Sequence, residues 1–525
     1  MEAGSVRQSK TEHNTRLEET APENAARDGF QVKENLAAKT VSASAPATSV
    51  SWRDWRWLGW RAIAALLGGL YLRLWMMRAF PQVGGDALIY GGIAKNLLLH
   101  RQFAITDGSG VVHPTLIRLP GYPFFLAGCF HVFGMGNYNA VAYLQIVLEL
   151  MACLLLADFV RRITSARAGL NVLWLAAMCP FTAVYSSAPL TESLTFDMIC
   201  LAIWSLERYL SRDSPTPVLL DSARVDPARG GLLVVFTAAI SYAALLRPDG
   251  ALVAFALWPA LLFARGPMGL SSALRRALLC ALVSVAPFGV WAVRNWSTFH
   301  VFEPLAPRYA NDPGEDPHLG WQHWVKTWCL DFTCTDEVYW NVPDGPLAME
   351  DLPALAFDSP QQRAETAALV AEYNGNQELS QQIDARFEAL ANERAEAHPI
   401  RTHIFLPLGR LADMTLRPRV ENLTIDLRWW QYYLHHSETR FSVVYGLVNV
   451  LFLVLGMVGL SYRPRYWPYM AAYLVLRSFL LMTIEAPETR YTLEFFPVLF
   501  ASGGFALQRM FSRKKARVAS AQRRF

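Results

Sequence analysis

The sequence predicts an all-α integral membrane protein with about ten transmembrane helices. Three observations support this fold class. Hydrophobic residues make up 53% of the 525 residues. Charged residues make up only 18%, whereas soluble domains usually carry about a quarter. The apolar residues gather in runs close to the roughly 20 residues that a helix needs to cross a bilayer.

Ten apolar segments are the predicted spans. They are 57–80, 138–160, 170–189, 192–210, 230–246, 249–264, 277–294, 441–461, 467–484 and 491–509. The segment 119–136 is also apolar, but if it crossed the membrane most of the clusters of arginine would fall outside. Because positive residues favour cytoplasmic loops, we expect 119–136 to lie at the membrane surface. Pro114, Pro120 and Pro123 suit such broken interfacial helices.

This topology places both termini inside and divides the chain into five parts. The parts are a disordered cytoplasmic tail at 1–50, an N-terminal transmembrane module at 51–294 with a first outer loop at 81–137, an extracytoplasmic region at 295–440, C-terminal transmembrane helices at 441–510, and a basic cytoplasmic tail at 511–525. The first tail is too poor in aromatic residues to bury a core. The outer region is too long and polar for a connector, and we expect it to be mostly helical, especially over 361–397.

Two of the seven cysteines lie in a polar segment of the outer region. Cys329 and Cys334 could form a disulfide there or remain two free thiols, and the sequence leaves both alternatives open. The other five cysteines lie in apolar segments and are predicted to be small core residues.

Ionisable residues gather at the outer ends of the predicted spans and in the outer loops. They are Asp86, Glu192, Arg247, Asp249, Arg294, Glu485, Glu488 and Arg490. Ionisable groups at membrane depth are costly and usually face a cavity or a partner. Their common side therefore predicts one polar site beneath the outer loop.

The two acidic candidates each allow a structural alternative. Asp86 follows Gly84-Gly85 and opens a helical stretch with Tyr90 one turn later, so its carboxylate could be a general base or a helix N-cap. Glu192 begins a predicted span. It could orient an acceptor or bind a metal, or it could simply complement the helix dipole.

The basic candidates are suited to anions. Arg490 could grip a phosphate with a fork of hydrogen bonds, or its side chain could extend to the membrane interface. Arg247 and Asp249 could form a tight turn closed by an ion pair. Lys95 and Arg118, in the first outer loop, could hold an anionic headgroup or remain solvated.

The order of motifs along residues 80–500 resembles a family of membrane enzymes. The pieces are Gly84-Gly85-Asp86-Ala87-Leu88-Ile89-Tyr90 with Ala94 and Leu97-Leu98, Arg118-Leu119-Pro120-Gly121-Tyr122-Pro123 with Phe133-Gly134, Pro189-Leu190-Thr191-Glu192-Ser193, Leu246-Arg247-Pro248-Asp249, Pro287 with Arg294-Asn295, Ala397-His398-Pro399, and Glu488-Thr489-Arg490-Tyr491. The sequence resembles the polyprenyl-phosphate-dependent glycosyltransferases of the GT-C fold. The branch is the bacterial family-39-like (RgtA/B/C/D-like) one, related to protein O-mannosyltransferases and lipid A aminoarabinose transferases.

The resemblance implies an inverting sugar transfer from a polyprenyl-phosphate donor to an acceptor at the outer face. It implies that 51–294 is the catalytic module, that Asp86 is the general base and that Glu192 arranges the site or a divalent metal ion. Arg490, and more weakly Arg247, would lie near the donor phosphate. The further substrate-binding candidates are Tyr90, Lys95, Arg118, Asp249, Glu488 and Tyr491.

Two departures from the mannosyltransferase pattern leave the sugar and the acceptor open. The chain has Asp86-Ala87 where many members have Asp-Glu, and Arg118-Leu119-Pro120 where many have Lys-Pro-Pro. We expect the protein in a bacterial inner membrane, with its site facing the periplasm or exterior and with membrane lipid but no nucleic acid as a partner. The alternatives are a transporter or flippase for a lipid-linked or anionic substrate, and an inactive scaffold that keeps the fold.

Overall fold

The computed structural model describes residues 57–80, 83–211, 227–263, 269–343, 345–376 and 378–522. All of these belong to one compact unit, which comprises 53–215 and 221–525. The tail predicted at 1–50 lies outside the described residues and stays a prediction. So does the division of the chain into five parts.

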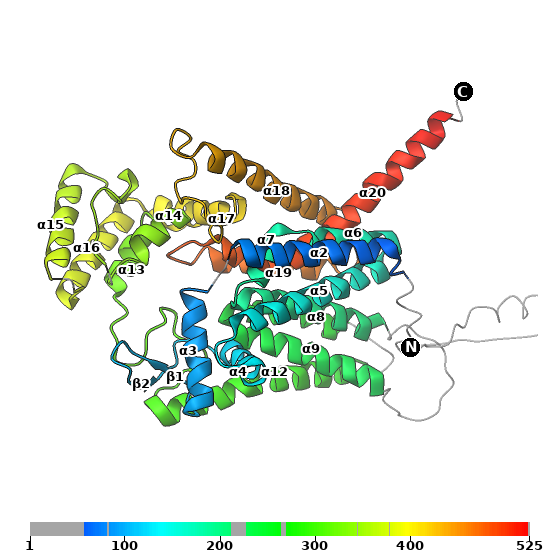
Figure 1. Cartoon of the computed structure of the whole chain (residues 1–525), viewed down its shortest axis with the longest axis horizontal. Helices are drawn as coiled ribbons and strands as arrows, with labels where there is room; N and C mark the ends of the chain where they lie inside the picture. Colours follow the sequence, from blue (N-terminus) through cyan, green and yellow to red (C-terminus); the bar gives the residue numbers. More distant parts are fainter. Residues whose placement is uncertain are drawn as a thin grey trace, which may run out of the picture. The chain divides into compact units, whose positions relative to one another are not determined.

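The ten predicted spans are helical. Their elements are α2 (Trp60–Ala79), α5 (Tyr138–Ile163), α6 (Ala166–Ala177), α7 (Pro180–Ser186), α8 (Thr191–Ser211), α9 (Pro227–Leu246), η2 (Pro248–Gly250), α10 (Ala251–Leu257), α11 (Pro259–Phe263), α12 (Gly269–Phe299), α18 (His436–Ser461), α19 (Trp467–Leu481), η6 (Thr489–Phe495) and α20 (Phe496–Gln522). Helices α2, α5, α8, α9 and α12 run roughly alongside one another (Figure 1). The mostly helical membrane fold predicted from the sequence is confirmed.

Four of the described helices are long and apolar enough to cross a membrane. They are Trp60–Ala79, Tyr138–Ile163, Leu270–Phe299 and His436–Ser461. The pair α6 and α7, bent by 58° at its break, would add a fifth. Gly230–Leu246 and Pro248–Phe263 are apolar but shorter. The remaining predicted spans carry more charge or fewer residues, so the total of ten crossings stays a prediction.

The first outer loop contains short elements across the ends of the long helices. It folds as α3 (Asp86–Leu99), an antiparallel hairpin of β1 (Ala104–Thr106) and β2 (Val112–Pro114), and α4 (Gly121–Phe133). Figure 1 shows α3 lying across the direction of the long helices. With 13 residues, α4 is about 20 Å long, which is too short for a bilayer core of about 30 Å. The short helices expected here are therefore present, and their position at the membrane surface stays a prediction.

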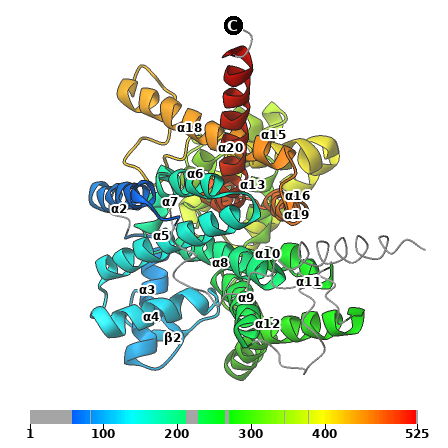
Figure 2. The same ribbon diagram turned by 90° about the vertical axis from the view of Figure 1, so that its right-hand side faces the viewer.

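A glycine allows α4 to pack closely on the bundle. A Cβ at Gly121 would lie 2.6 Å from the carbonyl oxygen of Leu245 in α9, so only glycine fits without a shift. Tyr242 donates a hydrogen bond of 3.0 Å to the Gly121 carbonyl at the same point. Figure 2 shows α4 beside α5 and α9, and both helices contact it. This packing fixes the loop that carries Arg118 and, through α3, Asp86.

A buried ion pair joins α2 to α5. Arg73 of α2 donates to Glu149 of α5 at 2.6 Å and to the carbonyl of Ala177 in α6 at the same distance. Both charged side chains are essentially unexposed. Because an unpaired charge at this depth is costly, the pair fixes α2 against α5 and α6.

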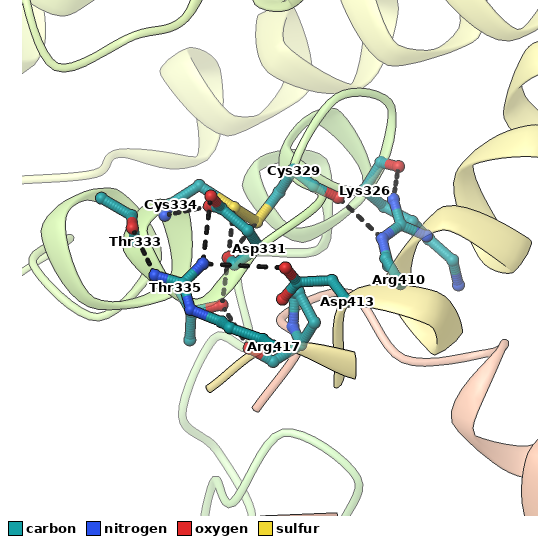
Figure 3. Close-up of a disulfide and its surroundings, with 10 residues drawn as sticks. Lys326, Cys329, Asp331, Thr333, Cys334, Thr335, Arg410, Asp413 and Arg417 are labelled. Carbon is teal, nitrogen blue, oxygen red and sulfur yellow. Dashed lines mark hydrogen bonds and ion pairs between the residues drawn. A yellow bond between two sulfur atoms is a disulfide. The ribbon is translucent and has the colours of Figure 1, made fainter. Parts of the chain in front are cut away.

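The region 295–440 has its own core. Its elements are α13 (Leu319–Lys326), α14 (Phe332–Cys334), η3 (Thr335–Tyr339), η4 (Ala354–Ala356), α15 (Pro360–Asn376), α16 (Gln381–Ala397), η5 (Arg401–Phe405) and α17 (Leu406–Leu416). Trp321, Trp324 and Trp328 pack with Phe387 at its centre. The segment predicted to be helical at 361–397 forms most of α15 and all of α16. Cys329 and Cys334 are joined by a disulfide (Figure 3), so the bonded alternative holds.

Candidate active site

Asp86 joins three segments that are far apart in the sequence. It is the first residue of α3, and the cap position before it is held by Gly85 with a φ of +50°, which favours glycine. Its Oδ1 accepts a hydrogen bond of 2.8 Å from Arg118, and its Oδ2 lies 3.0 Å from Arg490. The carboxylate is thus held by two arginines and does not serve as the N-cap.

Glu192 lies beside Arg247 at the start of α8. Its Oε1 accepts from Nη1 of Arg247 at 2.7 Å and lies 3.7 Å from Nε of Arg490. Arg247 also donates to Asp249 at 3.1 Å, so the tight turn with an ion pair is present. The same guanidinium nevertheless reaches Glu192, so the turn and the predicted site coincide.

Two residues that the sequence analysis missed complete the cluster. Arg477 of α19 lies 2.6 Å from Glu494 and 3.0 Å from Asp249, and Glu494 belongs to η6. Both lie inside predicted spans, at 467–484 and 491–509, whereas the analysis considered only span ends. A signal was available, because an arginine within an apolar segment predicts a buried acidic partner.

The residue before η6 and the first turn of η6 supply the remaining members, Glu488, Arg490 and Tyr491. Arg490 forms an ion pair with Glu488, which also accepts a hydrogen bond from the hydroxyl of Tyr491. The guanidinium of Arg247 lies 5.2 Å, and that of Arg490 5.7 Å, from the centre of the Tyr491 ring. Such cation–π contacts fix both arginines against one aromatic face.

Three predicted residues lie at the edge of the cluster or outside it. Tyr90 flanks it, since Arg118 lies 5.7 Å over its ring. Lys95 lies 6.0 Å from the ring of Tyr138 instead, and its role with a headgroup stays a prediction. Arg294 donates to the carbonyls of Thr115 and Phe103 and belongs to the support of the first outer loop.

We call nine side chains the arginine–carboxylate network. They are Asp86, Glu192, Asp249, Glu488, Glu494, Arg118, Arg247, Arg477 and Arg490. Five carboxylates face four guanidiniums, so the network has a formal charge of −1 when all members are ionised. None of the nine side chains is more than 26% exposed, and low exposure strengthens each charge interaction.

The pKa values of the two acids nearest Arg490 shift in opposite directions. Burial alone would raise the pKa of Asp86, but the charges and hydrogen bonds of Arg490 and Arg118 outweigh it and hold the pKa below its ordinary 3.8. Burial raises the pKa of Glu488 above its ordinary 4.5, although Arg490 opposes the shift. Asp86 is therefore ionised at neutral pH, and Glu488 is the more easily protonated neighbour.

The acidic residues do not fit a metal site as they are arranged. Asp86 and Glu192 each form ion pairs with arginines. The described parts of the chain contain no group of three or more histidine, cysteine, aspartate or glutamate side chains placed to hold a metal ion. We therefore derive no step through a metal.

No model of a known protein family matches the chain, and no curated protein sequence matches it. Solved structures are similar to it. An oligosaccharyltransferase from Archaeoglobus fulgidus, tethered to an acceptor peptide, is 13% identical with a TM-score of 0.45 and covers 87% of this chain and 50% of its own. The same organism's oligosaccharyltransferase AglB, in complex with an inhibitory peptide and a dolichol-phosphate, is 15% identical with a TM-score of 0.45, over 90% and 52%.

ArnT from Cupriavidus metallidurans, bound to undecaprenyl phosphate, is 16% identical with a TM-score of 0.36, over 86% of this chain and 78% of its own. The chain spans about half the length of the archaeal enzyme. Two of these solved structures contain a polyprenyl phosphate, namely dolichol-phosphate in AglB and undecaprenyl phosphate in ArnT.

Proposed function

We propose that the protein is an inverting glycosyltransferase, which moves a sugar from a polyprenyl-phosphate donor to an acceptor at the outer face of the membrane. The observation that carries the proposal is the contact between Asp86 and Arg490. A carboxylate able to take a proton and a guanidinium able to bind a phosphate lie 3.0 Å apart, within one buried network.

The reaction needs both of these groups. In an inverting displacement the acceptor attacks the anomeric carbon opposite the leaving group, and positive charge builds on the sugar ring. A carboxylate near the acceptor, here Asp86, takes the proton of its hydroxyl or amine. The departing lipid phosphate needs a cation rather than an acid, and the fork of Arg490 can supply it.

The contacts of Arg490 suggest how substrate binding prepares the base. In the described structure its partners are the carboxylates of Asp86, Glu192 and Glu488. A donor phosphate that binds Arg490 would take the place of some of these partners. Arg490 holds the pKa of Asp86 down. If Arg490 left Asp86 for the phosphate, the pKa of Asp86 would rise and Asp86 would become a stronger base.

Two features of the outer region support a site on the outer side of the membrane. The disulfide between Cys329 and Cys334 favours an oxidising compartment, because structural disulfides are rare in the cytosol. The chain just before Glu488 and Arg490 contacts this region, since the hydroxyl of Thr335 donates to the carbonyl of Pro487 at 3.0 Å. We therefore propose that the site faces the periplasm or exterior of an inner membrane.

A transfer assay tests the proposal. Membranes with the wild type, Asp86→Asn or Arg386→Gln, at matched expression, receive a panel of labelled polyprenyl-phosphate sugars. Arg386 is the control, because it forms an exposed ion pair of 2.6 Å with Glu372, outside the network. We expect the wild type and Arg386→Gln to turn over one donor equally, and Asp86→Asn to be slower by about 10²- to 10⁴-fold.

The other outcomes separate the alternatives. Turnover that survives in Asp86→Asn would keep the enzyme and remove Asp86 from the role of base. Turnover of no donor, with lipid-linked sugar flipped across proteoliposomes by the wild type, would replace the enzyme with the transporter.

A further inference from the structure

A second charged cluster lies in the outer region around Glu485. Arg308 lies 2.7 Å and Lys326 2.8 Å from the same oxygen of this carboxylate. Both cations also donate to the carbonyl oxygen of Thr483, at 2.8 and 2.9 Å. Two cationic side chains therefore share one carboxylate.

A third cation adds to the positive charge. Arg410 is fully buried and donates to the carbonyls of Cys329 and Lys326 (Figure 3). Burial lowers the pKa of Arg410 to about 10, so it stays charged at neutral pH. Within the described ranges it has no acidic side chain at ion-pair distance, and its Nη1 has no hydrogen-bond partner. Two cations thus contact Glu485, and the charge of Arg410 acts on it without contact.

Arg308 and Lys326 face solvent, whereas Glu485 does not. The side chains of Arg308 and Lys326 are 51% and 34% exposed, and that of Glu485 is 7% exposed. A guanidinium has five N–H donors and an ammonium has three, so both cations keep donors for a ligand. Burial, and then the charge of Glu485, raise the pKa of Tyr309 and of Tyr339, so both hydroxyls stay protonated as further donors.

The cluster adjoins the arginine–carboxylate network. Glu485 and Glu488 are three residues apart, and an extended chain spans at most about 3.6 Å per residue, so their α-carbons lie within about 11 Å of each other. A ligand could therefore contact both places at once. Glu388, the next acid near Tyr309, is already paired with His323 at 2.7 Å.

We propose that Arg308 and Lys326 form a second anion-binding site, which takes a phosphate or carboxylate group of the acceptor in place of Glu485. The assignment to the acceptor rests on the proposed function, but the binding of an anion does not. Glu485 occupies the position of the ligand, since carboxylates and phosphates accept the same forked hydrogen bonds. The uncompensated charge of Arg410 favours an anion there over an empty site.

Binding is tested without catalysis on the purified full-length protein. The probe is inorganic phosphate at constant ionic strength, and the readout is the rise of the thermal unfolding midpoint with phosphate concentration. We expect Arg308→Gln to weaken phosphate binding about tenfold and Glu485→Gln to strengthen it by a similar factor. The control Arg386→Gln should match the wild type.

The opposite signs distinguish a site from a structural ion pair. If Arg308 and Glu485 only hold each other, both variants destabilise the protein and neither changes its phosphate affinity by more than twofold. That result, or a change of the same sign in both, overturns the site. Should Arg308→Gln not fold, Lys326→Gln takes its place, and Glu485→Gln provides the second arm by itself.

Kinetics assign the ligand. In the transfer assay, Arg308→Gln should raise KM for the acceptor about tenfold and leave kcat and the donor KM within twofold. A raised donor KM would place the donor phosphate here and overturn the acceptor assignment. Opposite phosphate shifts without any transfer would uphold the anion site and overturn its link to an acceptor. Transfer without those shifts would overturn this inference alone.

Discussion

Buried arginines occur in both the network and the outer region, but their partners differ. The ion-pair partners of Arg490 among the described residues are the carboxylates of Asp86, Glu192 and Glu488. Arg394 of α16 pairs with one carboxylate, that of Asp358 at 3.3 Å, and also donates to the carbonyls of Ala356 and Leu355, at 2.8 and 2.7 Å. A side-chain partner can be exchanged for a substrate phosphate, whereas a backbone carbonyl cannot leave without unfolding the loop.

The difference separates a site from a support. Arg394 is fully buried, reaches Thr327 and Gln362 as well as the two carbonyls, and so ties α16 to α13 and to the loop before α15. The carboxylates around Arg490 provide no comparable link to the backbone. Backbone partners therefore distinguish Arg394 from Arg490, although both arginines have carboxylate partners.

The largest expected effect comes from Arg490→Lys. Lysine keeps the charge but loses the fork, so we expect kcat/KM for transfer to fall by about 10²- to 10³-fold. The thermal midpoint should change little, because the neighbouring carboxylates keep a cation. Steady-state transfer and thermal unfolding of the same preparation check this. A midpoint that falls as far as in the matching Arg394→Lys variant would break the comparison.

The matching substitution, Arg394→Lys, should act on stability instead. Lysine cannot reach all the acceptors that the guanidinium holds, so buried carbonyls lose their donors and the free energy of unfolding falls by about 2 to 3 kcal/mol. Hydrogen exchange of the backbone amides of α13 and α16 in urea reports the unfolding of this region. Transfer per folded molecule should stay within twofold of the wild type. A loss of kcat without a loss of stability would contradict a supporting role.

The sequence predicted the site through topology rather than through a motif. Asp86, Glu192 and Arg490 lie on one predicted side of the membrane, and the polar site expected there brings them together. The topology could not predict the pairs, because Arg247 and Glu192 are 55 residues apart and meet only through the packing of α8 and α9. The sequence analysis did not identify Arg477 as a site residue, because Arg477 lies within an apolar segment.

The fold was predictable to a similar degree. Apolar length predicted all ten helical segments. The position of 119–136 at the membrane surface, inferred from the distribution of arginine, stays a prediction. The hairpin at 104–114 was not predicted, since each of its strands has only three residues and a signal that short is indistinguishable from a loop. The bend between α6 and α7 depends on packing around Pro180, which hydropathy does not report.

A carboxylate of the outer region sharpens the comparison with a smaller effect. Burial raises the pKa of Asp413 to about 7, and the negative charges of Asp331 and Glu421 add to the shift. Arg417, 3.7 Å away, opposes the shift but does not outweigh it (Figure 3). In contrast, Asp86 is held ionised by two close arginines. The folded state therefore binds the Asp413 proton more tightly than the unfolded chain does, and stability falls as pH rises from about 4 to 7.

Asparagine cannot ionise, so Asp413→Asn should remove that slope and stabilise the protein at pH 8 by on the order of 2 kcal/mol, with the smallest difference from the wild type at pH 4. Thermal midpoints of both proteins across this range measure the slope. A variant that is less stable than the wild type at pH 8 would mean that Asp413 is a paired anion like Asp86. A buried carboxylate would then be ionised in this protein without two close arginines.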